Sequence, residues 1–270
     1  MQRSGSLYTL GFAGAMCVIC AVLVSSSAYF LRGPQERNKV LDRQRQVLSV
    51  AGLMKSGEDL SAEQVQQRFE ESIEKRFVNI ETGQALTSEE FQSQTGLDPR
   101  SYDSREASTN PALSKAAPAN NMARVIRIPN YAIVYYVVDG GQPTEIVLPI
   151  VGKGLWSTMY GFLALDKDTR TIRGITFYEH GETPGLGGEV DNPKWKAQWV
   201  NRKAYDENWT PQITVIKGQA GSPDENPYKV DGLSGATLTS RGVGNLVRFW
   251  LGEDGFKPFL EQFRKQGSAA

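Results

Sequence analysis

The sequence has few of the side chains that form disulfides or bind structural metals. Its 270 residues include two cysteines, Cys17 and Cys20, and one histidine, His180. Both cysteines lie in an apolar run near the amino terminus. The rest of the chain can therefore have neither a disulfide framework nor a cysteine-ligated zinc site, and we expect no metal site.

The sequence also lacks an excess of charge of either sign. Thirty Lys and Arg side chains balance thirty Asp and Glu side chains. Nucleic-acid-binding domains carry a basic excess, so we expect no nucleic acid among the partners. A composition of 40% hydrophobic and 22% charged residues is that of a folded protein with a packed core.

The first long apolar run extends from Leu7 to Leu31 without a charged residue. A helix of about 20 apolar residues crosses a bilayer, so we expect one uncleaved membrane anchor within an N-terminal segment, residues 1–32. The alternative is a signal peptide, in which Arg3 precedes the apolar run and the small residues 25–28 form a cleavage site. The run is longer than the usual signal-peptide core, which favours the anchor. Cys17 and Cys20 are three positions apart, and we expect them to serve helix packing rather than a redox or ligand site.

The charges around the span leave its orientation open. The basic residues Arg32, Arg37, Lys39, Arg43 and Arg45 follow the span, whereas Arg3 precedes it. The positive-inside rule would therefore keep the following domain in the cytoplasm. Long domains can cross the membrane regardless of such charges, so the rule is weak here.

The middle of the chain divides into a helical region, residues 33–91, and a loop or linker, residues 92–122. In the helical region, an amphipathic stretch follows the anchor, and a second helix begins at Ser61, which forms a capping-box pattern with Gln64. Apolar residues at spacings of four extend this second helix to Ile73. Residues 92–122 are rich in Ser, Pro, Asn and Ala and have no apolar period, which predicts an extended loop.

Residues 123–270 have the pattern of a domain with a sheet. Runs of β-branched and aromatic residues predict strands at 124–129, 131–141, 144–152, 159–166, 172–180 and 212–218. Apolar periodicity then predicts a closing helix from about Thr239 or Ser240 and a shorter one after it. The expected fold class is α+β, with a single N-terminal transmembrane helix followed by a mostly antiparallel sheet flanked by helices.

A glycine-rich bend, "VDGLSGATLTSRGV" at residues 230–243, precedes the closing helix and carries the hydroxyl side chains of Ser234, Thr237, Thr239 and Ser240. Helix N-termini attract anions because their unpaired N–H groups point outward. Gly232 and Gly235 allow the backbone to approach a ligand closely. The alternative is a simple cap, in which Thr239 or Ser240 satisfies a free amide.

This bend resembles the D-G-x-S/T-G-A-T motif of the FMN-binding domain family. The resemblance implies that FMN is joined through its phosphate to the hydroxyl of Thr237. It also implies that the other motif residues bind the cofactor, namely Asp231, Gly232, Ser234, Gly235 and Ala236. In this family a separate Mg-dependent flavin transferase attaches FMN taken from FAD. The threonine is then a modification acceptor, and the chain needs no catalytic residue of its own.

Two other loops and one lysine support the resemblance. "HGETPGLGGEV" at 180–190 is not a Rossmann fingerprint, because Val190 stands where a glycine is required. It resembles the family's E-T-P-G-L-G loop, in which Thr183 and Leu186 lie against the flavin ring and Glu182 and Gly187 belong to the cofactor site. "GLW" at 154–156 resembles a segment that places Leu155 and Trp156 near the ring, and Lys217 corresponds to a lysine near the cofactor. The alternatives are a plain turn for the glycine loop and core packing for Trp156.

His180 precedes the second loop and could donate a proton to a reduced flavin. A structural histidine at the end of a strand is the more common case, and we expect that role here.

Nearly the whole chain resembles the family of C subunits of bacterial sodium-translocating NADH:quinone oxidoreductases, with ubiquinone as acceptor. The alternatives are the G subunit of the Rnf complex, a membrane-anchored binding module without redox function, and a structural subunit. The first resemblance implies that covalent FMN relays electrons from an iron–sulfur centre to the flavin of the B subunit. The implied partners are the A, B, D, E and F subunits, the flavin transferase and membrane lipid. The flavin domain would face the periplasm from the inner membrane, against the positive-inside count.

Overall fold

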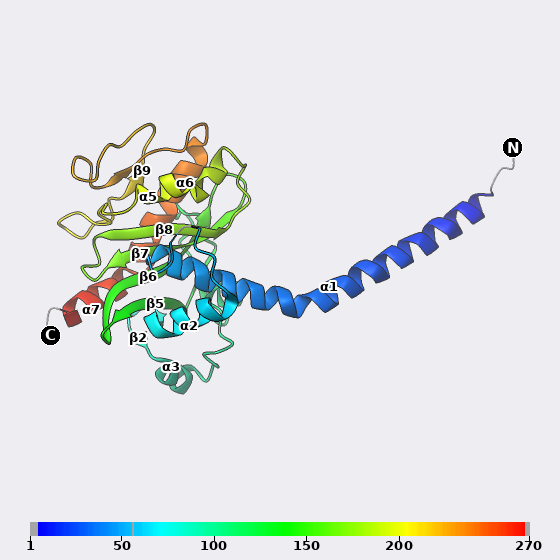
Figure 1. Ribbon diagram of the computed structural model, residues 1–270, viewed down its shortest axis with the longest axis horizontal. Coiled ribbons are helices and arrows are strands. Elements are labelled where there is room, and N and C mark those ends of the chain that lie inside the picture. The colour runs from blue at the N-terminus through cyan, green and yellow to red at the C-terminus, as the bar shows by residue number, and fades with distance from the viewer. Residues whose placement is uncertain (1–4, 56, 268–270) are drawn as a thin grey trace. The chain divides into compact units, whose positions relative to one another are not determined.

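The computed structural model describes residues 5–55 and 57–267 (Figure 1). Its contacts divide the chain into two compact units, Met1–Arg43 and Gln44–Ala270. Arg3, which precedes the apolar run, lies outside the described residues. All residues of the candidate site belong to the second unit.

The first unit consists of most of helix α1, Ser6–Val50. Its most apolar 18-residue window has a mean hydropathy of 2.0 and none of it is buried, as expected for a single membrane anchor. The span and the amphipathic stretch after it form one continuous helix that includes Pro34. Proline cannot donate a backbone hydrogen bond and disfavours the interior of a helix, yet α1 continues on both sides of Pro34. Cys17 and Cys20 are both exposed.

The second unit is built on a six-stranded antiparallel sheet with the order β2-β1-β5-β6-β7-β8. The strands are β1 (Ile73–Asn79), β2 (Ala85–Leu86), β5 (Tyr131–Asp139), β6 (Gln142–Lys153), β7 (Thr158–Asp166) and β8 (Ile172–Glu179). Neighbouring strands follow one another in the sequence except where β5 pairs with β1. This confirms the expected α+β class with an antiparallel sheet.

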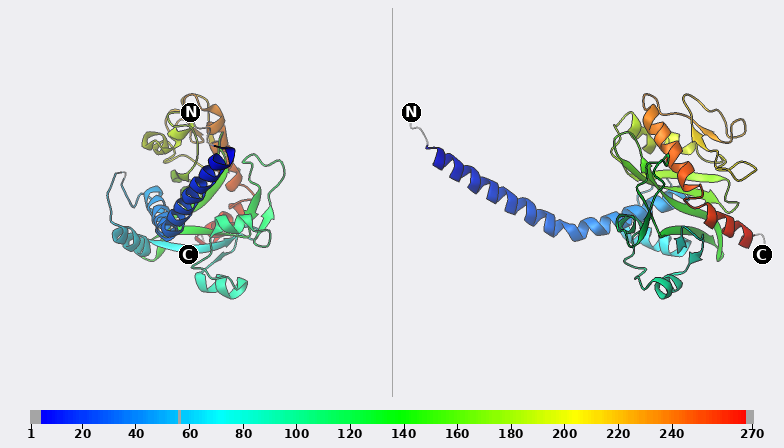
Figure 2. Two further views of the ribbon diagram at one scale, coloured as in Figure 1. Left: turned by 90° about the vertical axis from the view of Figure 1, so that its right-hand side faces the viewer. Right: turned by 180° about the vertical axis from the view of Figure 1, so that it is seen from behind.

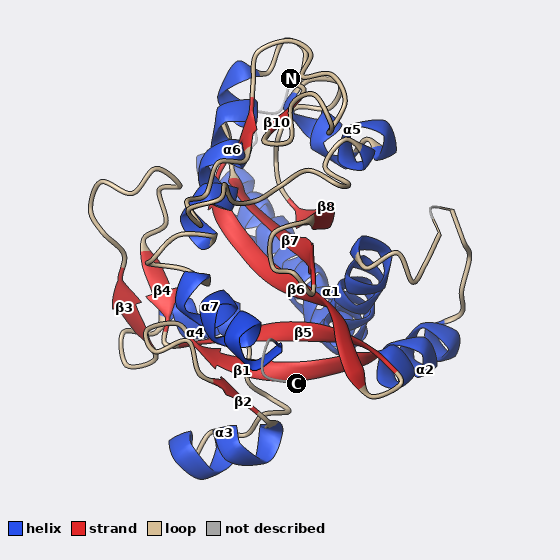
Figure 3. Ribbon diagram, turned by 90° about the vertical axis from the view of Figure 1, so that its left-hand side faces the viewer, coloured by secondary structure: helices blue, strands red, loops and turns tan. Residues whose placement is uncertain are grey.

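Helices cover both faces of the sheet. Successive residues of a strand point to opposite faces. Accordingly, Tyr135 packs on Phe69 of α2 (Ala62–Ser72), whereas Tyr136 stacks on Phe259 of α7 (Lys257–Gly267). Helix α6 (Thr237–Trp250) lies along β6 on the same face as α7, and the last turns of α1 lie near α2 on the other face (Figure 3). The packing of α6 against β6 therefore fixes the position of the start of α6, where the candidate site lies.

Strand β1 shows that residues 33–91 are not purely helical. The apolar spacing of four extends through Ile73, but α2 ends at Ser72 and Ile73 begins β1. Seven residue pairs join β1 to β5, from Ile73 opposite Val137 to Asn79 opposite Tyr131. The prediction was wrong here because pairing with a distant strand outweighs a local helical pattern.

The segment 92–122 is also more ordered than the predicted extended loop. It contains the end of α3 (Ser88–Thr95), all of α4 (Ser104–Thr109) and β3 (Ser114–Ala116). Strand β3 pairs with β4 (Arg127–Pro129) outside the main sheet. Helix α4 is only one to two turns long and is held by Asp103, whose side chain accepts hydrogen bonds from two backbone amides. Such elements have no apolar period, so hydrophobic patterning misses them.

The predicted strand at 212–218 is also short and lies apart from the main sheet. Only Thr214–Val215 form β9, which pairs in parallel with β10 (Lys229–Val230). A 3₁₀ helix, η1 (Gly187–Asp191), and α5 (Pro193–Ala197) precede this small sheet. These short elements cover the end of the second unit where α6 begins (Figure 2).

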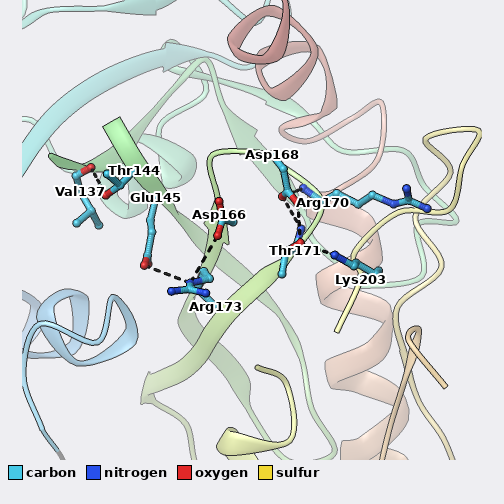
Figure 4. A network of polar contacts seen from close by, with 9 residues as sticks. All are labelled: Val137, Thr144, Glu145, Asp166, Asp168, Arg170, Thr171, Arg173 and Lys203. Atoms are coloured by element: carbon cyan, nitrogen blue, oxygen red, sulfur yellow. Dashed lines mark hydrogen bonds and ion pairs between the residues drawn. The ribbon is translucent and has the colours of Figure 1, made fainter. Parts of the chain in front are cut away.

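A polar network fixes the turn between β7 and β8 (Figure 4). The carboxylate of Asp168 accepts hydrogen bonds from the amides of Arg170 and Thr171 and from the Thr171 hydroxyl. That hydroxyl accepts one from Lys203 at 2.6 Å. Next to the turn, Arg173 pairs with Glu145 of β6 at 3.3 Å. The turn thereby joins the sheet to the segment that leads toward β10.

The Arg105 side chain attaches helix α4 to the sheet beside the candidate site. Both terminal nitrogens of Arg105 donate to the carboxylate of Glu179, at 2.5 and 2.8 Å, and its guanidinium lies 3.8 Å from the centre of the Tyr160 ring. The hydrogen bond to Glu179 raises the pKa of Arg105 above its ordinary value. Glu179 directly precedes His180 and the second glycine loop, so this contact holds the base of that loop.

We expect Arg105→Met to lower the free energy of unfolding by about 1 kcal/mol, because it removes a partly exposed ion pair and a cation–π contact. Urea unfolding of the detergent-solubilised full chain measures this change. Arg100→Met in the same segment is the control and should change stability by less than about 0.5 kcal/mol. Equal effects of the two substitutions would contradict this assignment.

Candidate functional site

The first part of the site is a tight turn after β6. The amide of Gly154 donates to the carbonyl of Ser157 at 2.9 Å, and the turn presents Leu155 and Trp156 outward. Leu155 is 45% exposed and Trp156 is 71% exposed. The alternative of core packing for Trp156 is wrong, because a core side chain would be buried. Two large apolar side chains at the tip of a rigid turn form a surface on which a planar ring can lie.

Glu182 is buried at the centre of the site. It is 5% exposed, and its carboxylate accepts hydrogen bonds from the amides of Leu155, Trp156 and Ser157 at 3.1, 2.9 and 3.2 Å. The hydroxyl of Thr239 donates to it at 2.5 Å. Burial raises the pKa of Glu182, but the hydrogen bonds from Thr239 and the amides outweigh burial and leave the pKa below its ordinary value. The ionised carboxylate thus joins the turn after β6, the loop after β8 and the first turn of α6.

The glycines of these segments are required by close packing around that carboxylate. A Cβ at Gly154 would lie 2.5 Å from Oε1 of Glu182. A Cβ at Gly187 would lie 2.6 Å from the Thr239 hydroxyl and 2.9 Å from Oε2 of Glu182. Gly187, expected as a cofactor-site residue, therefore serves the packing of the loop against α6.

Helix α6 begins at Thr237, two or three residues earlier than the predicted start near Thr239 or Ser240. The residue before it, Ala236, has no side chain able to cap the helix, so within the described residues its position leaves the first amides of α6 without a side-chain cap. Thr237 is exposed and its hydroxyl has no hydrogen-bond partner among the described residues. An exposed hydroxyl beside uncapped amides forms a site for a phosphate group.

The other hydroxyl side chains of the bend have different environments. Thr239 is 1% exposed and bonded to Glu182, and Ser240 is 4% exposed and accepts from the amide of Leu233 at 2.9 Å. Neither caps the helix as the simple-cap alternative required. Ser234 is exposed on the loop before the helix. Burial and existing hydrogen bonds therefore distinguish Thr237 from the two hydroxyls that follow it.

Apolar side chains surround the exposed start of α6. Leu186 is 44% exposed and lies against Gly235, where an added Cβ would be 2.9 Å from its Cδ2 atom. Gly235 has φ +69°, a conformation that glycine adopts at no cost. Leu238, which the sequence did not single out, is 52% exposed beside Thr237.

The backbone of Gly232 packs against the backbone of Lys217 and Gly218. The amide of Gly232 donates to the carbonyl of Gly218 at 3.0 Å, and an added Cβ at Gly232 would lie 3.4 Å from the Cα atom of Lys217. The Lys217 side chain is exposed next to the bend. Asp231 has a local role, since its carboxylate accepts from the amide of Ala220 at 2.6 Å.

Thr183 and His180 complete the loop after β8. The carbonyl of Thr183 accepts hydrogen bonds from the amides of Leu186 and Gly188, which folds the loop back on itself, and the Thr183 side chain is exposed. The ring of His180 contacts Asp191 at 2.8 Å through Nε2 and accepts from the Glu182 amide through Nδ1. His180 therefore holds both ends of the loop, which agrees with the structural role expected for it. In the part of the chain that the structure describes, no group of three or more His, Cys, Asp or Glu side chains could hold a metal ion.

Sequence reasoning missed the partner of Glu182. Thr239 was considered only as a helix cap, and nothing local to either residue indicates that a threonine and a glutamate 57 positions apart share a hydrogen bond. The packing roles of Gly154 and Gly242 were also missed, although both lie in the quoted motifs and each is required by close approach of another segment.

The FMN-binding domain family matches residues 154–252, which contain every segment of this site. The fold and the site thus define an FMN-binding domain that follows an apolar, membrane-anchor helix. The C subunit of the Na+-translocating NADH-quinone reductase of Yersinia pestis is 45% identical over 93% of this chain and 90% of its own length. The same subunit of Pseudomonas aeruginosa is 44% identical over 98% of each chain. The chain therefore belongs to the family of C subunits of the Na+-translocating NADH-quinone reductase.

A solved structure agrees with this assignment. The crystal structure of NqrC from Shewanella oneidensis has a TM-score of 0.73 and 32% sequence identity, and the match covers 86% of this chain and 99% of that one. The expected C-subunit family is confirmed over the alternative, the G subunit of the Rnf complex. The chain is thus a subunit of a multi-subunit oxidoreductase complex, and its apolar helix is consistent with a single-pass anchor there.

Proposed function

We propose that this chain carries FMN in phosphoester linkage to Thr237 and passes electrons from an iron–sulfur centre to the flavin of the B subunit. The observation that carries the proposal is the exposed hydroxyl of Thr237, which has no hydrogen-bond partner in the described part of the chain, at the N-terminus of α6, which has no side-chain cap there. A phosphate esterified there would lie against free backbone amides and the positive end of the helix dipole.

The apolar side chains around Thr237 fit the ring of the cofactor. Leu155, Trp156 and Leu186 are exposed on two turns joined by Glu182, and they provide an apolar wall. When bound, FMN supplies the electron-accepting chemistry, and the chain positions the ring and excludes water from one face. Lys217, exposed beside Gly232, provides a positive charge near the bend.

The attachment reaction requires a second protein. FMN is one half of FAD, so transfer from FAD forms the bond between the Thr237 oxygen and phosphorus and breaks the pyrophosphate bond. AMP leaves, and the hydroxyl proton is released. His180, the one histidine of the chain, contacts Asp191 and the Glu182 amide instead of Thr237. We therefore assign the general base, together with its Mg ion, to the flavin transferase.

The remaining parts of the proposal concern location and partners. The flavin domain would face the periplasm, with the A, B, D, E and F subunits as the other members of the complex. The basic residues that follow the span argue for the opposite orientation, but long domains cross membranes despite such charges. A covalent tether suits a periplasmic relay, because a flavin lost to the medium would not be replaced.

Flavin fluorescence of the denatured protein tests the proposal. The full chain is expressed with and without a flavin transferase, denatured, separated on a gel and illuminated. Fluorescence that survives denaturation and depends on the transferase is the expected result. A flavin that washes off would indicate a binding module without covalent linkage. No flavin in either preparation would indicate a purely structural role, and both of these results would overturn the proposal.

A further inference from the structure

Glu182 has three properties that are rarely found together in a residue that serves packing alone. It is 5% exposed, it is ionised, and five donor groups surround its carboxylate. The donors are the amides of Leu155, Trp156 and Ser157 and the hydroxyls of Ser157 and Thr239. A neutral amide side chain could accept only part of this set, because its NH₂ group is a donor. The surroundings are therefore built for a carboxylate anion.

The charge of this carboxylate is not cancelled by a cation. None of its five hydrogen-bond donors is a lysine, arginine or histidine side chain, and Glu182 takes part in no ion pair within the described part of the chain. Backbone amides and hydroxyls stabilise the carboxylate with their dipoles, but they are neutral, so a net charge of minus one remains. In a region poorly accessible to water, such a charge acts on neighbouring groups more strongly than a charge on the surface does.

The charge lies directly behind the surface proposed for the flavin ring. The amides of Leu155 and Trp156 donate to the carboxylate at 3.1 and 2.9 Å, and the side chains of these same residues face outward. An electron that reaches a ring on this surface adds one negative charge unless a proton arrives with it. A fixed anion behind the surface raises the free energy of that reduced state.

We infer that Glu182 is a positioning residue whose buried negative charge also lowers the reduction potential of the flavin. The inference rests on the proposed function, because it needs the ring to lie on Leu155 and Trp156. Its positioning part concerns the chain alone and can be tested before flavin is attached.

The apo-protein is tested first, by amide hydrogen exchange. In Glu182→Gln, the amides of Leu155, Trp156 and Ser157 should exchange at least about ten-fold faster than in the unmodified sequence, since each loses a charged acceptor. Amides in the middle of β6 should not change. Glu189→Gln is the matched control, because it removes a nearby carboxylate that, among the residues described, accepts a side-chain hydrogen bond only from Asn192. Equal protection of the 155–157 amides in both variants would overturn the positioning role.

The flavin-loaded full chain is then titrated by spectroelectrochemistry. The midpoint potential should move to a more positive value in Glu182→Gln, and it should not do so in Thr239→Val, which keeps the charge and removes one donor. The same positive shift in both variants would show that the loss of a hydrogen bond, and not of the charge, changes the potential. That result would overturn the role of the charge. If Glu182→Gln does not fold, Glu182→Asp keeps the charge, and a positive shift there would also overturn it.

The two proposals can fail separately. Absence of denaturation-stable flavin from the unmodified chain would overturn the proposed function and leave the hydrogen-exchange result standing. Stable flavin with an unchanged potential in Glu182→Gln would leave the proposed function standing and overturn the inference about charge.

Discussion

Replacement of Thr237 by alanine is expected to abolish covalent flavin completely while leaving the fold intact. The substitution removes the one oxygen that is both exposed and placed at the uncapped start of α6. Because Thr237 is exposed and its hydroxyl has no partner among the described residues, the free energy of unfolding should change by less than about 0.5 kcal/mol. In-gel fluorescence and the mass of the peptide that contains residue 237 measure the loss.

Three further substitutions test whether a hydroxyl at position 237 is sufficient for attachment and whether the neighbouring hydroxyls are required. Thr237→Ser keeps a hydroxyl at the same place and should retain flavin. Ser234→Ala removes the other exposed hydroxyl of the bend and should also retain it. Thr239→Val removes a buried hydroxyl that already donates to Glu182, so flavin should remain attached although the site is weakened. Flavin found on Ser234 in the Thr237→Ala protein would contradict the assignment of a single acceptor.

The sequence alone is sufficient to propose Thr237 as the acceptor because the motif is local. Residues 231–237 form one continuous stretch, and the glycines within it have backbone reasons to be there, such as the positive φ of Gly235. The strands of the main sheet from β5 to β8 were predicted for the same reason, since the apolar and β-branched runs between turn residues are local signals.

Long-range pairings could not be predicted from one sequence. Strand β1 forms because β5 offers it seven paired positions, and the hydrogen bond between Glu182 and Thr239 forms because two loops converge. In both cases the decisive partner is more than fifty residues away. Local propensity favours a helix at the start of β1 and a helix-capping role for Thr239. Tertiary contacts override both preferences.

Gly242 shows how strongly the site depends on such convergence, and Gly242→Ala is the second large effect that we expect. A Cβ at residue 242 would lie 2.5 Å from the carbonyl oxygen of Lys153 and 3.2 Å from the Cα atom of Gly154. Alanine improves helix propensity by about 1 kcal/mol, but the contact with backbone atoms cannot be relieved by rotating a side chain. We expect a net loss of about 2 kcal/mol in the free energy of unfolding.

The same substitution should slow flavin attachment without removing any group from the flavin site. Moving the start of α6 away from residues 153 and 154 stretches the contacts that Glu182 makes with Thr239 and with the Leu155 amide. Gly244→Ala is the matched control, because it gains the same helix propensity and its nearest contact, the amide nitrogen of Val215, is at 3.2 Å. Urea unfolding and the initial rate of fluorescence gain with transferase and FAD measure the two effects. Equal attachment rates and equal free energies of unfolding in Gly242→Ala and Gly244→Ala would contradict the prediction. Thr237 would then be positioned by something other than the close packing of α6 on the end of β6.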